Sequence, residues 1–134
     1  MQHLNLKEVP RPLKKNRTKD LAWICESLCL SSGRDTSSIA NRVIEKVLEQ
    51  SSRQKDSSSE SIARALNINR AQVNHHLRNL VDMGLLYRHK NRIHIRGGSL
   101  SAAIGEIRKD VKRFFEGMDS IAEDVDRSLG LRRR

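Results

Sequence analysis

The fold is decided by residues 57–98, which read SSSESIARALNINRAQVNHHLRNLVDMGLLYRHKNRIHIRGG. Apolar residues first recur every three or four positions, the spacing of one buried helix face. From Arg92 onward the period falls to two, which is typical of a strand with one face in the core. This order predicts a short helix, a tight turn, a longer helix and a two-stranded hairpin.

The first of these helices has a start signal and a stop signal. Glu60 follows Ser57 by three residues, just ahead of the apolar Ile62, and this spacing is typical of a capping box. Residues 67–69, Asn-Ile-Asn, then interrupt the helical pattern, and Asn69 is a favourable N-cap for the next helix. The sequence therefore predicts two helices joined by a turn of about three residues.

The second helix, over about residues 69–83, has a buried face and a polar face. Val73, Leu77 and Leu80 share the apolar face, and Gly84 suits the left-handed position that ends a helix. This geometry fits an α-helix into the major groove of DNA. The side chains with suitable chemistry for base edges are Arg70, Gln72, Asn74, His75 and Arg78.

The hairpin that follows is basic. Ile93 and Ile95 are expected to point inward, and Arg92, His94 and Arg96 outward. From residue 64 to 96 the chain has seven Arg or Lys and one acidic residue, which favours contact with phosphates. We expect these contacts to the DNA backbone from Ser58, Ser59, Arg64, Arg88, Lys90, Asn91 and Arg92.

Residues 61–98 resemble the winged-helix core of ArsR/MarR-like transcription regulators of bacteria and archaea, and the resemblance extends over roughly residues 35–98. Its motifs are S-x-x-x-I-A-R-A-L from Ser58 and V-x-x-H-L-R-x-L-V-x-M-G-L-L from Val73. It implies a mainly α, winged helix-turn-helix fold and a homodimeric, sequence-specific regulator that binds double-stranded DNA. Similar regulators pair their first and last helices across a two-fold axis, so the first helix could join the dimer interface.

Two more helices are expected before this stretch. One runs from about Thr18 to Leu30, and Gly33 is its stop signal. Leu21, Ile24, Cys25 and Leu28 form its buried face. The other spans about Asp35 to Gln50, and residues 51–59 then form a solvated connector because they contain no apolar side chain. With residues 1–17 as a flexible basic arm, the winged-helix domain covers residues 18–98.

The segment 99–130 predicts a long helix with a heptad seam, followed by a basic tail at 131–134. Its apolar residues alternate steps of four and three without a break, as in a coiled coil. We expect this seam to hold two chains together, the alternative being that the helix folds onto its own domain. The seam residues are Leu100, Ile104, Ile107, Val111, Phe114, Met118, Ile121 and Val125.

Composition supports a polyanionic partner. The 134 residues suffice for one core, and 26 Lys and Arg against 16 Asp and Glu give a formal net charge of +10. An aromatic content of 3% argues against surfaces that stack single-stranded bases. No segment is long and apolar enough to span a membrane, and the start lacks a secretory signal, so we expect a cytoplasmic protein associated with the nucleoid.

Other functions have less support. Cys25 and Cys29 lie four residues apart on a helix and are expected to be free, buried thiols. Together with the histidines they suggest a metal sensor, but no tetrahedral ligand set is complete. We therefore expect no metal or cofactor. No phosphate loop or nucleophile–base spacing indicates an enzyme. The remaining alternatives are a winged helix that binds RNA or protein, and an architectural DNA-binding protein with little sequence preference.

Overall fold

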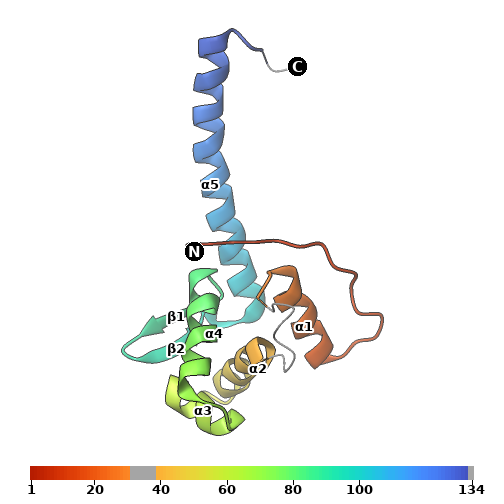
Figure 1. Ribbon diagram of the computed structural model, residues 1–134, viewed down its shortest axis with the longest axis vertical. Helices are drawn as coiled ribbons and strands as arrows, with labels where there is room; N and C mark the ends of the chain where they lie inside the picture. Colours follow the sequence, from red (N-terminus) through yellow and green to blue (C-terminus); the bar gives the residue numbers. More distant parts are fainter. Residues whose placement is uncertain (31–38, 133–134) are drawn as a thin grey trace.

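A two-stranded hairpin packs beside a group of helices in the computed structural model, which describes residues 1–30 and 39–132. Its elements in chain order are α1 (Arg17–Ser27), α2 (Ile39–Ser52), α3 (Ser59–Leu66), α4 (Arg70–Asp82), β1 (Leu86–His89), β2 (Arg92–Ile95), a 3-10 turn η1 (Arg96–Gly98) and α5 (Leu100–Leu129). Figure 1 shows α1 to α4 and the hairpin gathered into one body, from which α5 projects. The predicted mainly α, winged helix-turn-helix architecture is confirmed.

The helix-turn-helix is formed by α3, a three-residue turn and α4. Asn67 ends α3 in a left-handed conformation with φ of 53°, and its N–H donates to carbonyls of the last helical turn. Asn69 begins α4, because its side chain accepts a hydrogen bond from the backbone N–H of Ala71. Gly84, with φ of 94°, follows α4 as predicted.

The capping box of α3 lies one residue later than predicted. Ser58, not Ser57, is the N-cap: its hydroxyl accepts from the Ser61 N–H, and the Ser61 hydroxyl accepts from the Ser58 N–H. Ser57 is instead buried, and its carbonyl accepts from the N–H of Ile93 at 2.7 Å. The prediction of a fully solvated connector at 51–59 is therefore wrong, because its end pairs with the hairpin.

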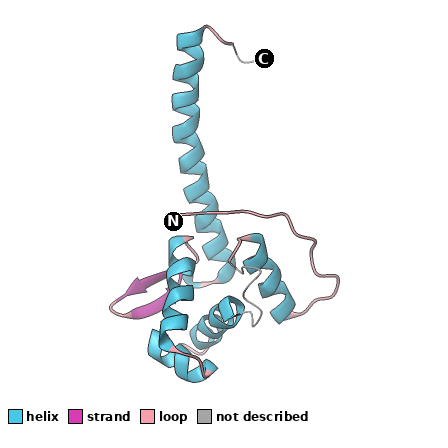
Figure 2. Cartoon of the chain, in the orientation of Figure 1, coloured by secondary structure: helices cyan, strands magenta, loops and turns pink. Residues whose placement is uncertain are grey.

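The hairpin has the predicted strands and turn. Leu86 pairs with Ile95 and His89 with Arg92, and the two turn residues Lys90 and Asn91 both have positive φ. This turn conformation matches the right-handed twist of the strands. Figure 2 shows the hairpin projecting from the side of the body next to α4.

One core joins α1, α2, α3, α4, the hairpin and the first turns of α5. Ile93 and Ile95 point inward as predicted, next to Leu77 and Leu80 of α4, which have no exposed surface. Every one of these elements contributes fully buried side chains, and α5 adds Ala103 and the nearly buried Ile107. The hairpin and α4 therefore have a fixed relative position, held by shared packing.

The first two helices are present with shifted ends. α1 buries Leu21 and Cys25 as predicted, but it ends at Ser27, because Cys29 adopts a left-handed φ of 55° and turns the chain. Cys29 is consequently exposed, which corrects the prediction of two buried thiols. The predicted boundaries at Gly33 and Asp35 lie outside the described residues.

The segment before α1 lies against the body. It contains no helix or strand up to Asn16, but the N–H of Gln2 donates to the Asp82 carbonyl at the end of α4. Further along, the indole N–H of Trp23 donates to the Val9 carbonyl at 2.8 Å. Figure 1 shows this segment passing around the body, and the flexibility expected for residues 1–17 stays a prediction.

α5 has the predicted length, and its seam divides into two parts. Ser99 caps its start and Gly130, with φ of 71°, ends it. The first part of the seam packs on the chain's own core, and its part in a dimer interface stays a prediction; these residues are Leu100, Ile104, Ile107 and Val111. Four apolar residues share the seam beyond the body and are exposed: Phe114, Met118, Ile121 and Val125.

Candidate nucleic-acid interface

The exposed face of α4 is polar along its length. Val73, Leu77 and Leu80 anchor the other face in the core, so the direction of the exposed face is fixed. Three of the predicted base-reading residues follow one another at spacings of three on the exposed side: Gln72, His75 and Arg78. Arg70, in the first turn, is exposed as well.

Asn74 is placed differently from its neighbours. It is half-buried, and its side-chain Oδ1 accepts a hydrogen bond from the hydroxyl of Ser59 at 2.5 Å. The guanidinium of Arg88 also donates to this oxygen, at 3.4 Å. Asn74 therefore connects α3, α4 and β1, and only its amide nitrogen is left for a base.

The two serines predicted to contact the DNA backbone already have partners. The hydroxyl of Ser58 caps α3 by accepting a hydrogen bond from the N–H of Ser61. The Ser58 backbone therefore lies at the start of the helix. Ser59 is buried, and its hydroxyl bonds to Asn74. Ser59 thus lies behind the interface and holds a residue of α4 in place.

The hairpin places its polar residues on two faces. Arg88 pairs with the inward-facing Ile93 and so points toward α4, whereas Lys90, Asn91 and Arg92 are exposed at the tip. On the outer face the rings of Tyr87 and His94 stack with centroids 5.1 Å apart. Tyr87 was not among the residues predicted from the sequence, although its alternation with buried Leu86 places it outward.

Arg96 departs from the predicted outward basic set. Its Nη1 donates to Asp110 Oδ2 of α5 at 2.6 Å, and its Nη2 donates to Oδ1 at 3.2 Å. This hydrogen-bonded pair lowers the pKa of Asp110 and raises that of Arg96. Arg96 therefore fastens α5 to the end of the hairpin and is not available to a phosphate.

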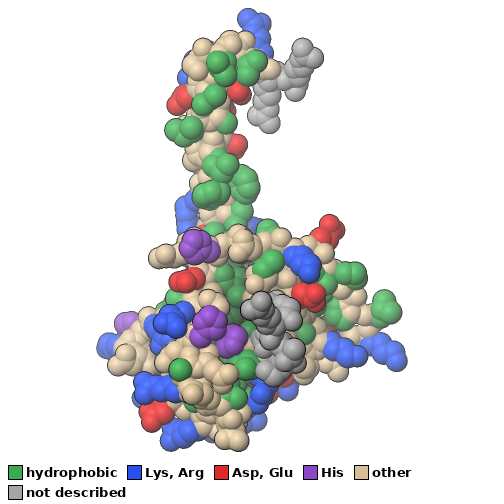
Figure 3. Space-filling view, viewed as in Figure 1, with side chains coloured by type: hydrophobic (Ala, Val, Ile, Leu, Met, Phe, Trp, Pro, Cys, Tyr) green, Lys and Arg blue, Asp and Glu red, His purple; other side chains and the backbone are tan. Residues whose placement is uncertain are grey.

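The other basic side chains of this region have no such partner. Within residues 1–30 and 39–132, no carboxylate lies within ion-pair distance of six of them: Arg64, Arg70, Arg78, Arg88, Lys90 and Arg92. Figure 3 shows basic side chains along the side of the body formed by the hairpin and α3. Their positive charge is not neutralised within the described chain, so this side attracts polyanions.

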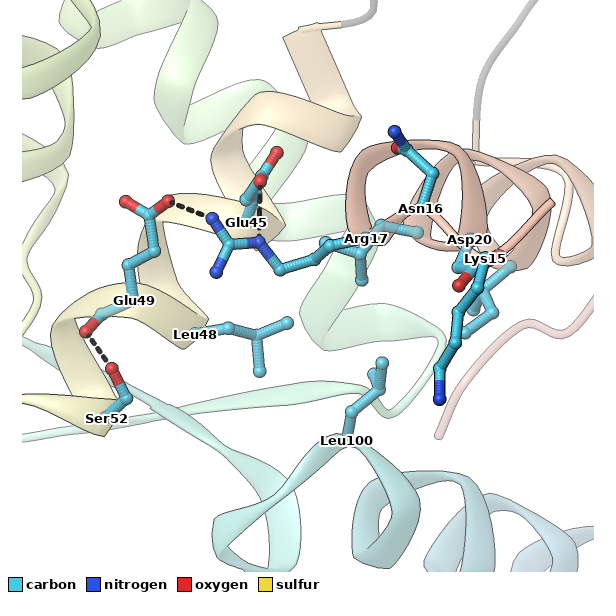
Figure 4. Close-up of a pocket in the computed structure, with 11 residues that line it drawn as sticks. Lys15, Asn16, Arg17, Asp20, Glu45, Leu48, Glu49, Ser52 and Leu100 are labelled. Carbon is cyan, nitrogen blue, oxygen red and sulfur yellow. Dashed lines mark hydrogen bonds and ion pairs between the residues drawn. The ribbon is translucent and has the colours of Figure 1, made fainter.

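A separate hollow of about 480 Å³ lies between α1, α2 and the start of α5. Figure 4 shows Leu48 and Leu100 facing it, while Arg17 bridges Glu45 and Glu49 at its edge. The Arg17 nitrogens are 3.3 and 3.5 Å from these carboxylates. Among the described residues, those that line the hollow come from α1, α2, the start of α5 and the segment before α1, and not from α4.

Metal binding has no site among the described residues, where no three His, Cys, Asp or Glu side chains come together. Cys25 is buried in the core, and this burial raises the pKa of its thiol to about 12. A thiol with so high a pKa is a poor metal ligand and nucleophile at neutral pH. Of the described helices, none is long and apolar enough to cross a membrane.

The geometry defines the class of fold: a winged helix-turn-helix, with an exposed second helix beside a basic hairpin. Residues 46–88, from α2 to β1, match the family model described as bacterial regulatory protein, arsR family. The resemblance to ArsR-like regulators is thus confirmed over this segment, which indicates a DNA-binding transcription regulator. No curated protein and no solved structure is similar enough to the chain to count as a match.

Proposed function

We propose that this protein is a sequence-specific regulator of transcription that binds duplex DNA, with α4 in the major groove and the hairpin on the backbone. The supporting observation is the exposed polar face of α4, flanked by basic side chains that lack carboxylate partners among the described residues. A DNA ligand would place the protein at the nucleoid, in the cytoplasm.

Base reading is assigned to the exposed side chains of α4. Arg78 can donate two hydrogen bonds to guanine, and Gln72 can pair twice with adenine; each such pair gives about 1–3 kcal/mol of discrimination. His75 follows Gln72 by three residues and extends the same surface, and Arg70 is exposed in the first turn of α4. Asn74 contributes through its amide nitrogen, because its oxygen already accepts from Ser59.

Backbone contact is assigned to the hairpin and to α3. Lys90, Asn91 and Arg92 are exposed at the tip of the hairpin, and Arg64 is exposed on α3. These side chains carry no information about sequence, but they set the affinity and its dependence on salt.

Salt dependence tests this assignment. Binding to a duplex should weaken linearly on a logarithmic salt scale, and Lys90→Ala or Arg92→Ala should each reduce the slope by about 0.9. Arg127→Ala is the matched control, because Arg127 is exposed near the far end of α5 and pairs with Asp124. Equal slopes in all variants would remove the hairpin from the interface, and tighter binding to structured RNA than to duplex DNA would favour an RNA-binding module.

We also propose that the protein is a homodimer held by the part of α5 beyond the body. In this arrangement the body binds DNA, and Phe114, Met118, Ile121 and Val125 bury their exposed surface against a second copy. Two linked bodies gain affinity because binding of the first raises the effective concentration of the second.

A further inference from the structure

The projecting part of α5 has an apolar face that is wider than a simple seam. Phe115 and Leu129 are 54% and 68% exposed, and they lie beside the four seam residues on the same flank of the helix. Ala122 falls between them, so this flank is apolar at every seventh residue. On the opposite flank Gly117 and Asp124 occupy the corresponding positions. The two flanks are therefore chemically different.

The difference between the flanks distinguishes the two ways of pairing a second copy. In a parallel pair each flank meets the opposite flank of the partner, which would set Leu129 beside an Asp124 carboxylate. In an antiparallel pair the two-fold axis is perpendicular to the helices, so like flanks meet. Phe115 then packs over Ala122 of the other copy, a large side chain against a small one.

The charge of α5 is also divided along its length. Residues 108–113 contain four basic residues and one acidic residue, whereas residues 116–126 contain five acidic residues and no basic one. Negative charge near the C-terminal end of a helix opposes the helix dipole, so these acids favour an external source of positive charge. Parallel pairing would set the two basic segments against each other along their whole length. In the antiparallel register that pairs Phe114 with Val125, residues 116–123 of the two copies still face each other, but each basic segment lies beside the end of the partner's acidic segment at Asp126.

The end of the helix fits the same arrangement. When Phe114 lies opposite Val125 and Met118 opposite Ile121, all four seam residues are in facing pairs. In this register Gly130, which ends the helix with φ of 71°, lies opposite Lys109, next to the point where the partner's body begins. The projecting helix is thus just long enough to cover its partner.

We propose that a second copy of this chain binds the projecting part of α5 in antiparallel orientation, in the register that pairs Phe114 with Val125. This inference rests on the proposed homodimer and specifies its geometry. The paired helices then form a rod, and each body ends at Val111. With a rise of about 1.5 Å per residue, the two Val111 residues lie about 25 Å apart along this rod. One DNA-binding body stands at each end of the rod, so the two copies of α4 are held apart rather than side by side.

Disulfide cross-linking tests the orientation in the full chain, with Cys29→Ser to remove the exposed native thiol. An equimolar mixture of the Phe114→Cys and Val125→Cys proteins should form a mixed disulfide on mild oxidation. Val125→Cys alone should cross-link several-fold less, because its two copies lie about 16 Å apart along the axis, beyond the reach of a disulfide. Efficient cross-linking of Val125→Cys to itself, with no mixed product, would overturn the orientation while leaving the homodimer intact. A monomer in sedimentation of the wild type would overturn the homodimer and this inference with it.

Surface charges give a second test that leaves the seam unchanged. Lys112 and Asp126 are exposed, and the antiparallel register brings them to the same side of the rod. Lys112→Glu should weaken the dimer by roughly three- to tenfold, and adding Asp126→Lys should restore it. In a parallel dimer Lys112→Glu would only exchange one like-charged pair for another, so an unchanged dissociation constant would contradict the proposal.

Discussion

Replacing Asp110 should loosen α5 from the hairpin. The Asp110 side chain is 10% exposed and its carboxylate accepts two hydrogen bonds from Arg96, which is 25% exposed. Hydrogen bonds to charged groups contribute about 1.5–3 kcal/mol. Asp110→Ala should lower the free energy of unfolding by that amount, because the guanidinium keeps only two weaker partners, the Gly84 carbonyl 3.4 Å away and Glu106 3.9 Å away.

The matched control is Arg113→Ala. Arg113 contacts the same carboxylate, but its side chain is 69% exposed, so its removal should cost only about 0.2–1 kcal/mol. Urea unfolding at one fixed protomer concentration measures both variants, and a double-mutant cycle of Arg96→Ala with Asp110→Ala gives the coupling energy. An Asp110→Ala protein within about 0.5 kcal/mol of wild type, or a cycle without coupling, would refute the reasoning.

The same pair predicts a pH dependence. Its hydrogen bonds from Arg96 lower the pKa of Asp110 in the folded protein below its ordinary value of 3.8. The stability that this carboxylate contributes is therefore complete above about pH 4 and is lost as the pH falls through the lowered pKa. The difference in unfolding free energy between wild type and Asp110→Asn should be constant at higher pH and shrink in that acid range; a difference that grew with acid would contradict the assignment.

Two further predictions concern assembly and the thiols. Phe114→Ala with Ile121→Ala should give monomers in sedimentation at micromolar concentration, because truncating a buried Phe or Ile costs about 2–5 kcal/mol. The control variant Glu116→Ala should remain dimeric. A double variant that stays dimeric would contradict the assignment of the α5 seam as the dimer interface. Iodoacetamide at pH 8 should alkylate the exposed Cys29 at least tenfold faster than Cys25, whose pKa burial raises to about 12; equal rates by mass spectrometry would contradict the buried environment of Cys25.

Local signals in the sequence were sufficient for most of the fold. Helical spacing, Asn69 as an N-cap and Gly84 as a stop defined α4, and the period of two defined β2 with Ile93 and Ile95 inward. Each of these features depends on neighbours within one or two turns. The exposed face of α4 could be predicted for the same reason, since anchoring three apolar residues in the core fixes the direction of the others.

The errors came from contacts between distant segments. Ser57 has the spacing of a capping residue, but it pairs with Ile93, which lies 36 positions later, so the cap moves to Ser58. Arg96 alternates like an outward strand residue, but the carboxylate of Asp110 on α5 draws it away from solvent. A heptad pattern likewise shows that a helix face is apolar without showing what covers it.

The division of the α5 seam illustrates the last point. Ile107 and Phe114 occupy equivalent positions in the repeat, yet Ile107 is 6% exposed in the chain's own core and Phe114 is 63% exposed. The body ends between them, and only its three-dimensional extent decides which of the two needs a partner. The widening of the apolar face at Phe115, Ala122 and Leu129 was visible in the sequence as a second heptad series.

The central claim is that α4 reads DNA sequence, and selection of bound sites from a pool of random duplexes tests it most directly. The wild type should enrich a defined motif, and Gln72→Ala and Arg78→Ala should each lose preference at particular positions of that motif while keeping the rest. Lys90→Ala should weaken binding to all duplexes and leave the motif unchanged. A wild-type pool without any enriched motif, or a uniform loss of affinity in the two α4 variants, would contradict the assignment of α4 as the reading helix.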